Sequence, residues 1–444
     1  MFRKVGNLNI VTIFCNTSME LNMNDLNPLY GEQTKLSISN MSFSNKKLSN
    51  FPVYIKSISY VKKACAIANF RAGLLQEHIM QQITNACDII IKGYNELHFP
   101  VDVYSGGGGI AINMNVNEVI ASLAGSNVSP VNHVNMSQST SDVCHTSLRL
   151  SLSHSIKFLE ESLFILISSL YKKGHEFENI NTIARTCWQD GMQVSAGALF
   201  TSTASALKRQ THLYGHYRKT LTEINLGWTV IGTGTGASYK YREHILQSLK
   251  EVFEYEFTYR EDKGDSSQYP DDIAALSSAI RRTSEILSKL CKDLRILSSG
   301  PETGLGELIL PNIQAGSSFF PGKSNPIIPE TIIQCAMLIS GNDSIIQSQL
   351  GNGEVHLNVW EPMMGFLLLE NLNMLINATQ ILTYKCIKQI QINKTVCEAY
   401  ANSTMPLLVK YKEELGYDFV VNMIKKEGLQ NVITKIKGEQ NETV

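Results

Sequence analysis

The sequence has few charged residues and almost no net charge. Of its 444 residues 18% are charged, and 39 Lys and Arg stand against 40 Asp and Glu, which gives a formal net charge of −1. A chain with this balance has no global attraction to nucleic acid or to an anionic membrane surface. We therefore expect neither of these as a partner, and any positive charge that a ligand needs has to be local.

The sequence also lacks paired cysteines and long apolar runs. Its nine cysteines are scattered without a Cys-x-x-Cys pair, which excludes a zinc-ribbon spacing and a dithiol redox motif. Free thiols at this frequency are typical of a reducing cytosol, so we expect a cytoplasmic protein. No apolar run reaches the ~18 residues that a membrane-spanning helix needs. Residues 1–26 are expected to form a loosely ordered tail.

The spacing of apolar residues predicts long helices in the middle of the chain, where proline is sparse. One seam of three- and four-residue steps runs from Leu148 to Leu170, and a second runs from Leu276 to Leu297. Further stretches with helical periodicity cover residues 194–221, 240–256, 328–350 and 366–390. Strand signals are confined to Val101–Tyr104 and Thr229–Ile231. This pattern predicts an all-α protein with a central long-helix bundle, and seams of this length also favour oligomerisation.

The segment of residues 316–326, with the sequence GSSFFPGKSNP, is the most informative part of the chain. Its glycines permit unusual backbone dihedral angles. Its lysine is suited to hold a substrate carboxylate, and a serine beside backbone N–H groups could have its alkoxide stabilised. The residues alone therefore favour a functional loop over an ordinary connection.

This segment resembles the signature loop GSSxMPxKxNP of the class II fumarase/aspartase superfamily. Five further segments resemble motifs of that family, in the same order along the chain. Four precede the loop, namely Asn113–Val119 (NMNVNEV), His133–Thr140 (HVNMSQST), Asn225–Gly234 (NLG and GTG) and Asp293–Pro301. The fifth, Asn358–Pro362 (NVWEP), follows the loop. The resemblance spans nearly the whole chain. Three segments are closer to the aspartase form than to the fumarase form, namely Val61–Ala64, Pro100–Tyr104 and Leu310–Gly316.

The resemblance implies a three-domain fold in which the central bundle forms a homotetramer. Its boundaries place an N-terminal, mainly helical domain at residues 1–136, the bundle at residues 137–391 and a short helical C-terminal domain at residues 392–444.

The implied activity is that of a carbon–nitrogen lyase, aspartate ammonia-lyase, which eliminates ammonia from L-aspartate to give fumarate and needs no metal or organic cofactor. A serine base removes a proton beside a carboxylate, which becomes an aci-carboxylate intermediate. By motif position the base is Ser317, with Ser318 as a donor to the intermediate. The expected substrate-binding residues are Ser139 and Thr140 at the aci-carboxylate, Lys323 and Asn325 at the other carboxylate, Thr186 near the leaving amine, and Asn113, Ser141 and Cys187 beside them.

Three residues depart from the family pattern at this expected site. Ile110 stands where the family has Thr, Ser141 where it has Asn, and Cys187 where it has His or Gln. Because each change removes or weakens a hydrogen-bonding group, two alternatives stay open. One is a fumarase or a related lyase of succinyl substrates, and the other is a catalytically impaired homologue that acts as a helical scaffold.

Overall fold

The computed structural model describes residues 27–253 and 255–441, and the chain divides into two compact units. Unit 1 comprises the described part of Met1–Ser153 with Thr220–Asp271 and Ser348–Phe366. Unit 2 comprises His154–Lys219, Asp272–Gln347 and the described part of Leu367–Val444. The expected tail, residues 1–26, lies outside the described residues. The division into three domains stays a prediction.

Unit 1 is built on helix α2 (Pro52–Arg71), which packs against α3 (Glu77–Lys92) and α7 (Tyr239–Phe253). Helix α4 (Ile110–Ala124) contacts α3 and α1 (Glu32–Met41). The remaining short elements of this unit are η1 (Leu48–Asn50), η2 (Glu96–His98), the π-helix η3 (Pro130–Val134), α8 (Lys263–Gln268), η4 (Leu350–Asn352) and the parallel pair β3 (Glu223–Ile224) and β4 (Thr258–Tyr259).

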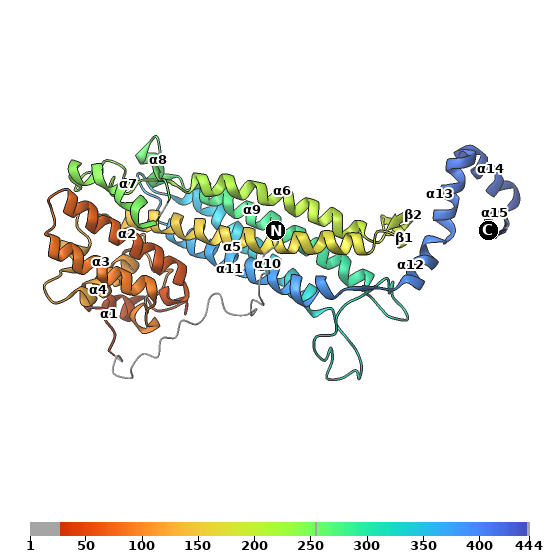
Figure 1. The fold of residues 1–444 in the computed structure, drawn as a ribbon, viewed down its shortest axis with the longest axis horizontal. Helices are drawn as coiled ribbons and strands as arrows, with labels where there is room; N and C mark the ends of the chain where they lie inside the picture. Colours follow the sequence, from red (N-terminus) through yellow and green to blue (C-terminus); the bar gives the residue numbers. More distant parts are fainter. Residues whose placement is uncertain (1–26, 254, 442–444) are drawn as a thin grey trace, which may run out of the picture. The chain divides into compact units, whose positions relative to one another are not determined.

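Long helices that run side by side form most of unit 2 (Figure 1). They are α6 (Ala198–Thr220), α9 (Asp271–Leu297), α10 (Ile327–Gln349) and the larger parts of α5 (Thr140–Glu176) and α11 (Glu361–Lys385). The leucines of both predicted seams are buried in these helices, except the last one, Leu297, which is half-buried. The prediction of a long-helix bundle is therefore confirmed, because the apolar periodicity follows the helical repeat over many turns.

Polar side chains join the helices of unit 2 into a closed ring. Each hydrogen bond in the ring links one helix to the next, from α5 through α6, α9, α10 and α11 back to α5. The pairs are Tyr171 with Ser205, Tyr214 with Thr283, Ser277 with Asp343, Asn342 with Asn371, and Gln380 with Ser162. Because four members of the first three pairs are buried, these bonds satisfy polar groups inside the bundle.

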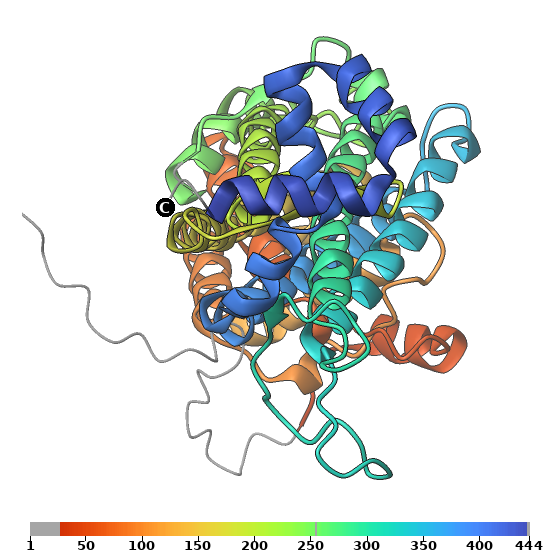
Figure 2. The ribbon, with the colours of Figure 1, turned by 90° about the vertical axis from the view of Figure 1, so that its right-hand side faces the viewer.

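The rest of unit 2 consists of short sheets and the C-terminal helices. Strands β1 (Asn181–Thr186) and β2 (Gln189–Ser195) form an antiparallel hairpin. The hairpin contacts α12 (Lys394–Ala401) and α13 (Thr404–Leu415), which continue into α14 (Tyr417–Glu427) and α15 (Leu429–Asn441), drawn in blue in Figure 2. A small apolar core joins the last three helices. The antiparallel pair β5 (Leu308–Ile309) and β6 (Gln391–Ile392) and the short η5 (Ile387–Gln389) complete the unit.

Both predicted strands are wrong. In Val101–Tyr104 only Asp102 makes an isolated bridge, to Lys47, because the Asp102 carboxylate accepts the Tyr104 N–H and turns the chain. In Thr229–Ile231 the backbone of Thr229 has a positive φ of 61°, which interrupts an extended segment. Within the described residues strands form only two-stranded sheets, so the all-α class is confirmed. No helix in those residues is long and apolar enough to cross a membrane.

Candidate active site

The first turn of α5 places three of the expected substrate-binding hydroxyl groups side by side. Ser139 caps the helix, because its Oγ accepts the backbone N–H of Ser141 over 3.2 Å. Thr140 and Ser141 follow as the first helical residues, and all three side chains are half-buried. The N-terminus of a helix favours negative charge, so this turn is suited to bind a carboxylate.

Buried Asp142 holds this turn in place from the inside. One carboxylate oxygen accepts the N–H of Ser139 over 3.0 Å, and the other accepts the N–H groups of Gly227 at 3.0 Å and Thr229 at 3.2 Å. Burial raises the pKa of Asp142 to about 6, although these three hydrogen bonds act in the opposite direction. The carboxylate thus joins the start of α5 to the segment that carries the NLG motif.

Asn113 of α4 contacts Thr140 from the buried side. Its side chain is 1% exposed, and its Nδ2 donates to the Oγ1 of Thr140 over 3.0 Å. The structure therefore places Asn113 against one of the expected binding residues. Ile110, at the N-terminal end of the same helix, is 45% exposed.

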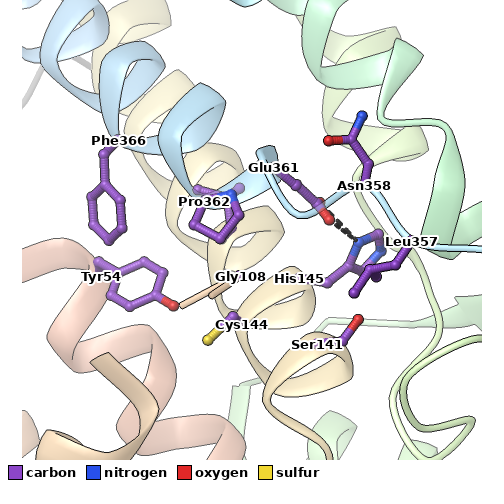
Figure 3. Close-up of a pocket in the computed structure, with 11 residues that line it drawn as sticks. Tyr54, Gly108, Ser141, Cys144, His145, Leu357, Asn358, Glu361, Pro362 and Phe366 are labelled. Atoms are coloured by element: carbon purple, nitrogen blue, oxygen red, sulfur yellow. Dashed lines mark hydrogen bonds and ion pairs between the residues drawn. The ribbon is translucent and has the colours of Figure 1, made fainter. Parts of the chain in front are cut away.

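A small cavity of about 20 Å³ lies next to this turn, which is room for a single water molecule. Figure 3 shows its lining residues, which come from α2, the glycine-rich segment before α4, α5 and the start of α11. Ser141 and Cys144 line it from α5, while Asn358 and Glu361 line it from the segment of the NVWEP motif. The cavity itself is therefore too small for a dicarboxylate.

A buried histidine links a cation to a carboxylate at this cavity. The Nδ1 of His145 lies 2.8 Å and 3.0 Å from the two carboxylate oxygens of Glu361, and the Nε of Arg149 donates to the Nε2 of His145 over 2.6 Å. Because Nε2 accepts this bond, the imidazole carries its proton on Nδ1, toward Glu361. Ser266 Oγ lies 3.3 Å from the same Nε2. The imidazole is therefore held in one orientation between the Arg149 guanidinium and the Glu361 carboxylate.

The signature loop in unit 2 is closed at its neck by hydrogen bonds. The N–H of Gly316 donates to the carbonyl of Lys323 over 3.1 Å, and the Nδ2 of Asn325 donates to the carbonyl of Gly316 over 2.5 Å. A Cβ at position 316 would collide with the Lys323 carbonyl, so only glycine fits there. Asn325 thus ties the ends of the loop together.

Within the loop the hydroxyl oxygen of Ser317 accepts two backbone N–H groups. The donors are Phe319 at 3.0 Å and Phe320 at 2.9 Å. Ser318 and Lys323 are exposed on the same loop, and the Lys323 ammonium lies 5.2 Å from the centre of the Phe320 ring. Two N–H donors on one oxygen stabilise negative charge there, which is what a serine needs in order to act as a base.

Thr186 and Cys187 lie on a separate element of unit 2, at the turn of the β1–β2 hairpin. Cys187 and Trp188 occupy the two central positions, with φ values of 52° and 60°. Both residues are exposed, whereas most of the described cysteines are buried.

The hairpin is anchored by Arg185, the residue before Thr186. Its Nη1 donates to the buried carboxylate of Glu307 over 2.6 Å, and its guanidinium lies 5.2 Å from the centre of the Tyr400 ring. Thr182 donates to the other oxygen of Glu307 over 2.5 Å. This buried pair fixes the base of the hairpin and leaves its turn exposed.

The structure groups the expected site residues into two sets. Unit 1 carries Asn113, Ser139, Thr140 and Ser141, and unit 2 carries Thr186, Cys187, Ser317, Ser318, Lys323 and Asn325. Six buried groups behind these sets were not predicted from the sequence as site residues, namely Lys62, Asp142, His145, Arg149, Glu307 and Glu361. Two of them left a recognisable signal, because Asp142 follows a capping serine by three residues and Arg149 follows His145 by four.

Comparisons with known proteins agree with the fold and the motifs. A family model described as "Lyase" matches residues 24–341. An aspartate ammonia-lyase from Helicobacter pylori strain J99 is 35% identical over 90% of this chain and 88% of its own length. An aspartate ammonia-lyase from Escherichia coli K12 is 34% identical over 87% of this chain and 84% of its own length.

Solved structures of related lyases also have the fold of this chain. A fumarate lyase:delta crystallin protein from Brucella melitensis superposes with a TM-score of 0.88 at 34% identity, covering 93% of this chain and 92% of that one. A class II fumarase from Schistosoma mansoni gives a TM-score of 0.87 at 28% identity, covering 94% of this chain and 95% of that one. The matched family model and these relatives confirm the expected class, a carbon–nitrogen lyase, and the chain belongs to the lyase family.

Proposed function

We propose that this protein is an aspartate ammonia-lyase, which reversibly eliminates ammonia from L-aspartate to give fumarate and acts as a cytoplasmic homotetramer. The observation that carries the proposal is the hydroxyl oxygen of Ser317, which accepts two backbone N–H groups inside the signature loop. The ammonia-lyases among the relatives support the choice of substrate.

In the first step Ser317 acts as the base. Its alkoxide, stabilised by the N–H groups of Phe319 and Phe320, takes a proton from the carbon next to the side-chain carboxylate of aspartate. The electron pair of the broken C–H bond moves onto that carboxylate, which becomes an aci-carboxylate with two negative charges. Preorganised donors are the largest means of lowering the energy of such an intermediate.

Ser139 and Thr140 supply these donors from the first turn of α5, and Ser318 adds a further one. Since the oxygens of Ser139 and Thr140 already accept N–H groups, their own hydrogens are left to donate outward. Lys323 and Asn325 hold the other carboxylate, with the ammonium of Lys323 as a point charge.

In the second step the carbon–nitrogen bond breaks. The electron pair of the aci-carboxylate returns to form the carbon–carbon double bond, and the protonated amine leaves with the bonding pair as ammonia. Thr186 lies near the amine, with Ser141 and Cys187 beside it. Both Ser141 and Cys187 are weaker hydrogen-bonding groups than those of the family, so we expect slow turnover.

The test is a comparison of L-aspartate with L-malate on the purified full-length chain. The ultraviolet absorbance of the conjugated double bond of fumarate reports product from either substrate. We expect fumarate from aspartate, and a Ser317→Ala variant should lower kcat by about 100-fold or more.

Three outcomes would contradict the proposal. Turnover of malate with aspartate untouched would identify a fumarase. Turnover of neither substrate would favour the helical scaffold. A Ser317→Ala variant that loses less than about tenfold in kcat, which corresponds to ~1.4 kcal/mol, would show that Ser317 is not the base.

A further inference from the structure

A buried ammonium group lies behind the first turn of α5. Lys62 of α2 is 0% exposed, and its Nζ donates to the Oδ1 of Asn135 over 3.0 Å and to the Oε1 of Gln138 over 2.9 Å. Burial lowers the pKa of Lys62 to about 8, so the group still carries its charge at neutral pH. A buried charge costs free energy unless hydrogen bonds or an opposite charge stabilise it. Both hydrogen-bond partners of Lys62 here are neutral amides.

The Oδ1 of Asn135 connects the ammonium of Lys62 to two side chains of helix α4 through hydrogen bonds. This oxygen accepts Lys62 Nζ together with the Nδ2 groups of Asn113 and Asn117, each over 3.2 Å. Three donors on one oxygen hold both asparagine side chains in one orientation, with their nitrogens toward Asn135. The amide of Asn113 therefore cannot turn over without losing this bond.

The same Nδ2 of Asn113 also donates to the Oγ1 of Thr140 over 3.0 Å. A hydroxyl oxygen that accepts this bond directs its own hydrogen away from Asn113. Thr140 is half-buried at the start of α5, and a hydrogen directed away from the buried Asn113 is free to donate to a carboxylate at that helix end. The orientation of one hydroxyl thus follows from that of a buried amide, and the orientation of the amide follows from a buried cation.

We propose that Lys62, Asn135 and Asn113 form a buried relay that fixes the hydroxyl of Thr140 as a donor to the carboxylate on which negative charge develops. The inference rests on the proposed function for the identity of that carboxylate. Asn113, Asn135 and Lys62 are positioning residues in this relay, since Thr140 is its only member that touches the substrate. The relay lowers the barrier much more than it strengthens binding, because a fixed donor gains most when the charge on its acceptor grows; its loss should weaken the binding of a dicarboxylate by a measurable factor of less than about threefold.

The test is a double-mutant cycle on kcat in the full-length protein. Asn113→Leu keeps the shape of the side chain and removes the donor, and Thr140→Val removes the hydroxyl group. We expect Asn113→Leu to lower kcat by about 30-fold when Thr140 is present and by less than about threefold in the Thr140→Val background, with KM changed by less than about threefold. An equal loss in both backgrounds would overturn the relay.

Asn117→Leu is the matched control. Asn117 is equally buried on the same helix and donates to the same oxygen of Asn135, but it makes no hydrogen bond to Thr140. Its effect on kcat should be the same factor in both backgrounds. A dependence of the Asn117 effect on Thr140 as large as that of Asn113 would mean that general packing couples the sites, and this would overturn the relay.

Thermal unfolding shows whether Asn113→Leu folds. If it does not, Asn113→Asp serves as a second variant for the same test. Asn113→Asp preserves the shape but presents only acceptors, so the hydroxyl of Thr140 has to turn inward and donate to it. We expect a loss of kcat at least as large as that of Thr140→Val. A kcat near that of the wild type would overturn the relay.

Binding of succinate separates failure of the relay from failure of the proposed function. If the wild type turns over neither substrate, the proposed function fails, and the same cycle is then measured on succinate affinity. A loss of affinity in Asn113→Leu that disappears in the Thr140→Val background would still support the relay. No such coupling would overturn both.

Discussion

The backbone N–H of Phe320 donates to the hydroxyl oxygen of Ser317 over 2.9 Å, next to the N–H of Phe319 at 3.0 Å. Both donors belong to the backbone of the same loop as Ser317. The energy needed to orient them is therefore supplied by folding of the loop, whose neck is closed at Gly316 and Asn325. Catalysis by Ser317 should thus depend on the backbone of its neighbours as well as on its own side chain.

Removing the N–H of Phe320 should lower the rate. Phe320→Pro has no donor at this position, and loss of one such donor is expected to lower kcat by about 100-fold. Phe320→Ala keeps the N–H and serves as the control, with a small effect on kcat. Steady-state kinetics of both variants with aspartate measure the difference. Equal kcat values for the proline and alanine variants would contradict a role for this N–H.

Restoring a hydroxyl group at position 110 should raise the rate. Ile110 is exposed at the N-terminal end of α4, so threonine is accommodated without a change in the core. If the missing donor limits stabilisation of charge, Ile110→Thr should increase kcat by about tenfold. Ile110→Val, which has the same shape without the hydroxyl, should leave kcat unchanged. A kcat for Ile110→Thr at or below that of the valine variant would indicate that the site has adapted to another ligand.

Breaking the buried ion pair at the base of the hairpin should destabilise the protein. Glu307→Gln leaves the Arg185 guanidinium without its counter-charge, with an expected cost of about 3 kcal/mol in the free energy of unfolding. Glu178→Gln removes the carboxylate of an exposed pair with His175 and should cost less than ~1 kcal/mol. Urea denaturation of both variants measures the contrast. Similar midpoints would show that the buried pair contributes no more than a surface pair.

The buried ammonium of Lys62 should make stability depend on pH in the alkaline range. Its pKa falls from 10.5 to about 8 on folding, so between these values the unfolded chain binds a proton that the folded chain does not. The free energy of unfolding of the wild type should therefore rise with pH between pH 8 and pH 10.5. Measured relative to Lys62→Met, the rise should be about 3 kcal/mol.

Denaturation at the two ends of that window measures the difference. Lys56→Met, which removes an exposed ammonium from the same helix, serves as the control and should follow the wild type. A constant difference between the wild type and Lys62→Met at all pH values would contradict the lowered pKa of Lys62.

The long helices were predictable because their cores are periodic. The leucines from Leu148 to Leu170 are buried along one face of α5, and no other regular structure satisfies that spacing. The β1–β2 hairpin was not predictable in this way. Its second strand is polar and mostly exposed, and its turn is formed by Cys187 and Trp188, which are unusual at positive φ.

The candidate site was predictable where its residues belong to a recognised motif, whether buried or exposed. Ser317, Lys323 and the hydroxyl groups of α5 follow from the resemblance, because their chemistry is visible in the sequence. The buried groups that orient them come from distant segments, as with Lys62, which lies 73 residues from Asn135 in the sequence. Such pairs depend on packing and leave no local pattern.

The ring of polar bonds in unit 2 determines how the long helices align along their length. Leucine seams repeat, so two helices that slide past each other by one heptad present nearly the same apolar face. The hydrogen bond between Tyr214 and Thr283 forms at only one position along the two helices. A shift would leave the buried hydroxyl group of Tyr214 without this partner, whereas Thr283 would keep its bond to the Ala279 carbonyl of its own helix. The ring therefore selects a single alignment among several of similar apolar burial, and a redesign of this bundle should keep these pairs even where leucine would pack more tightly.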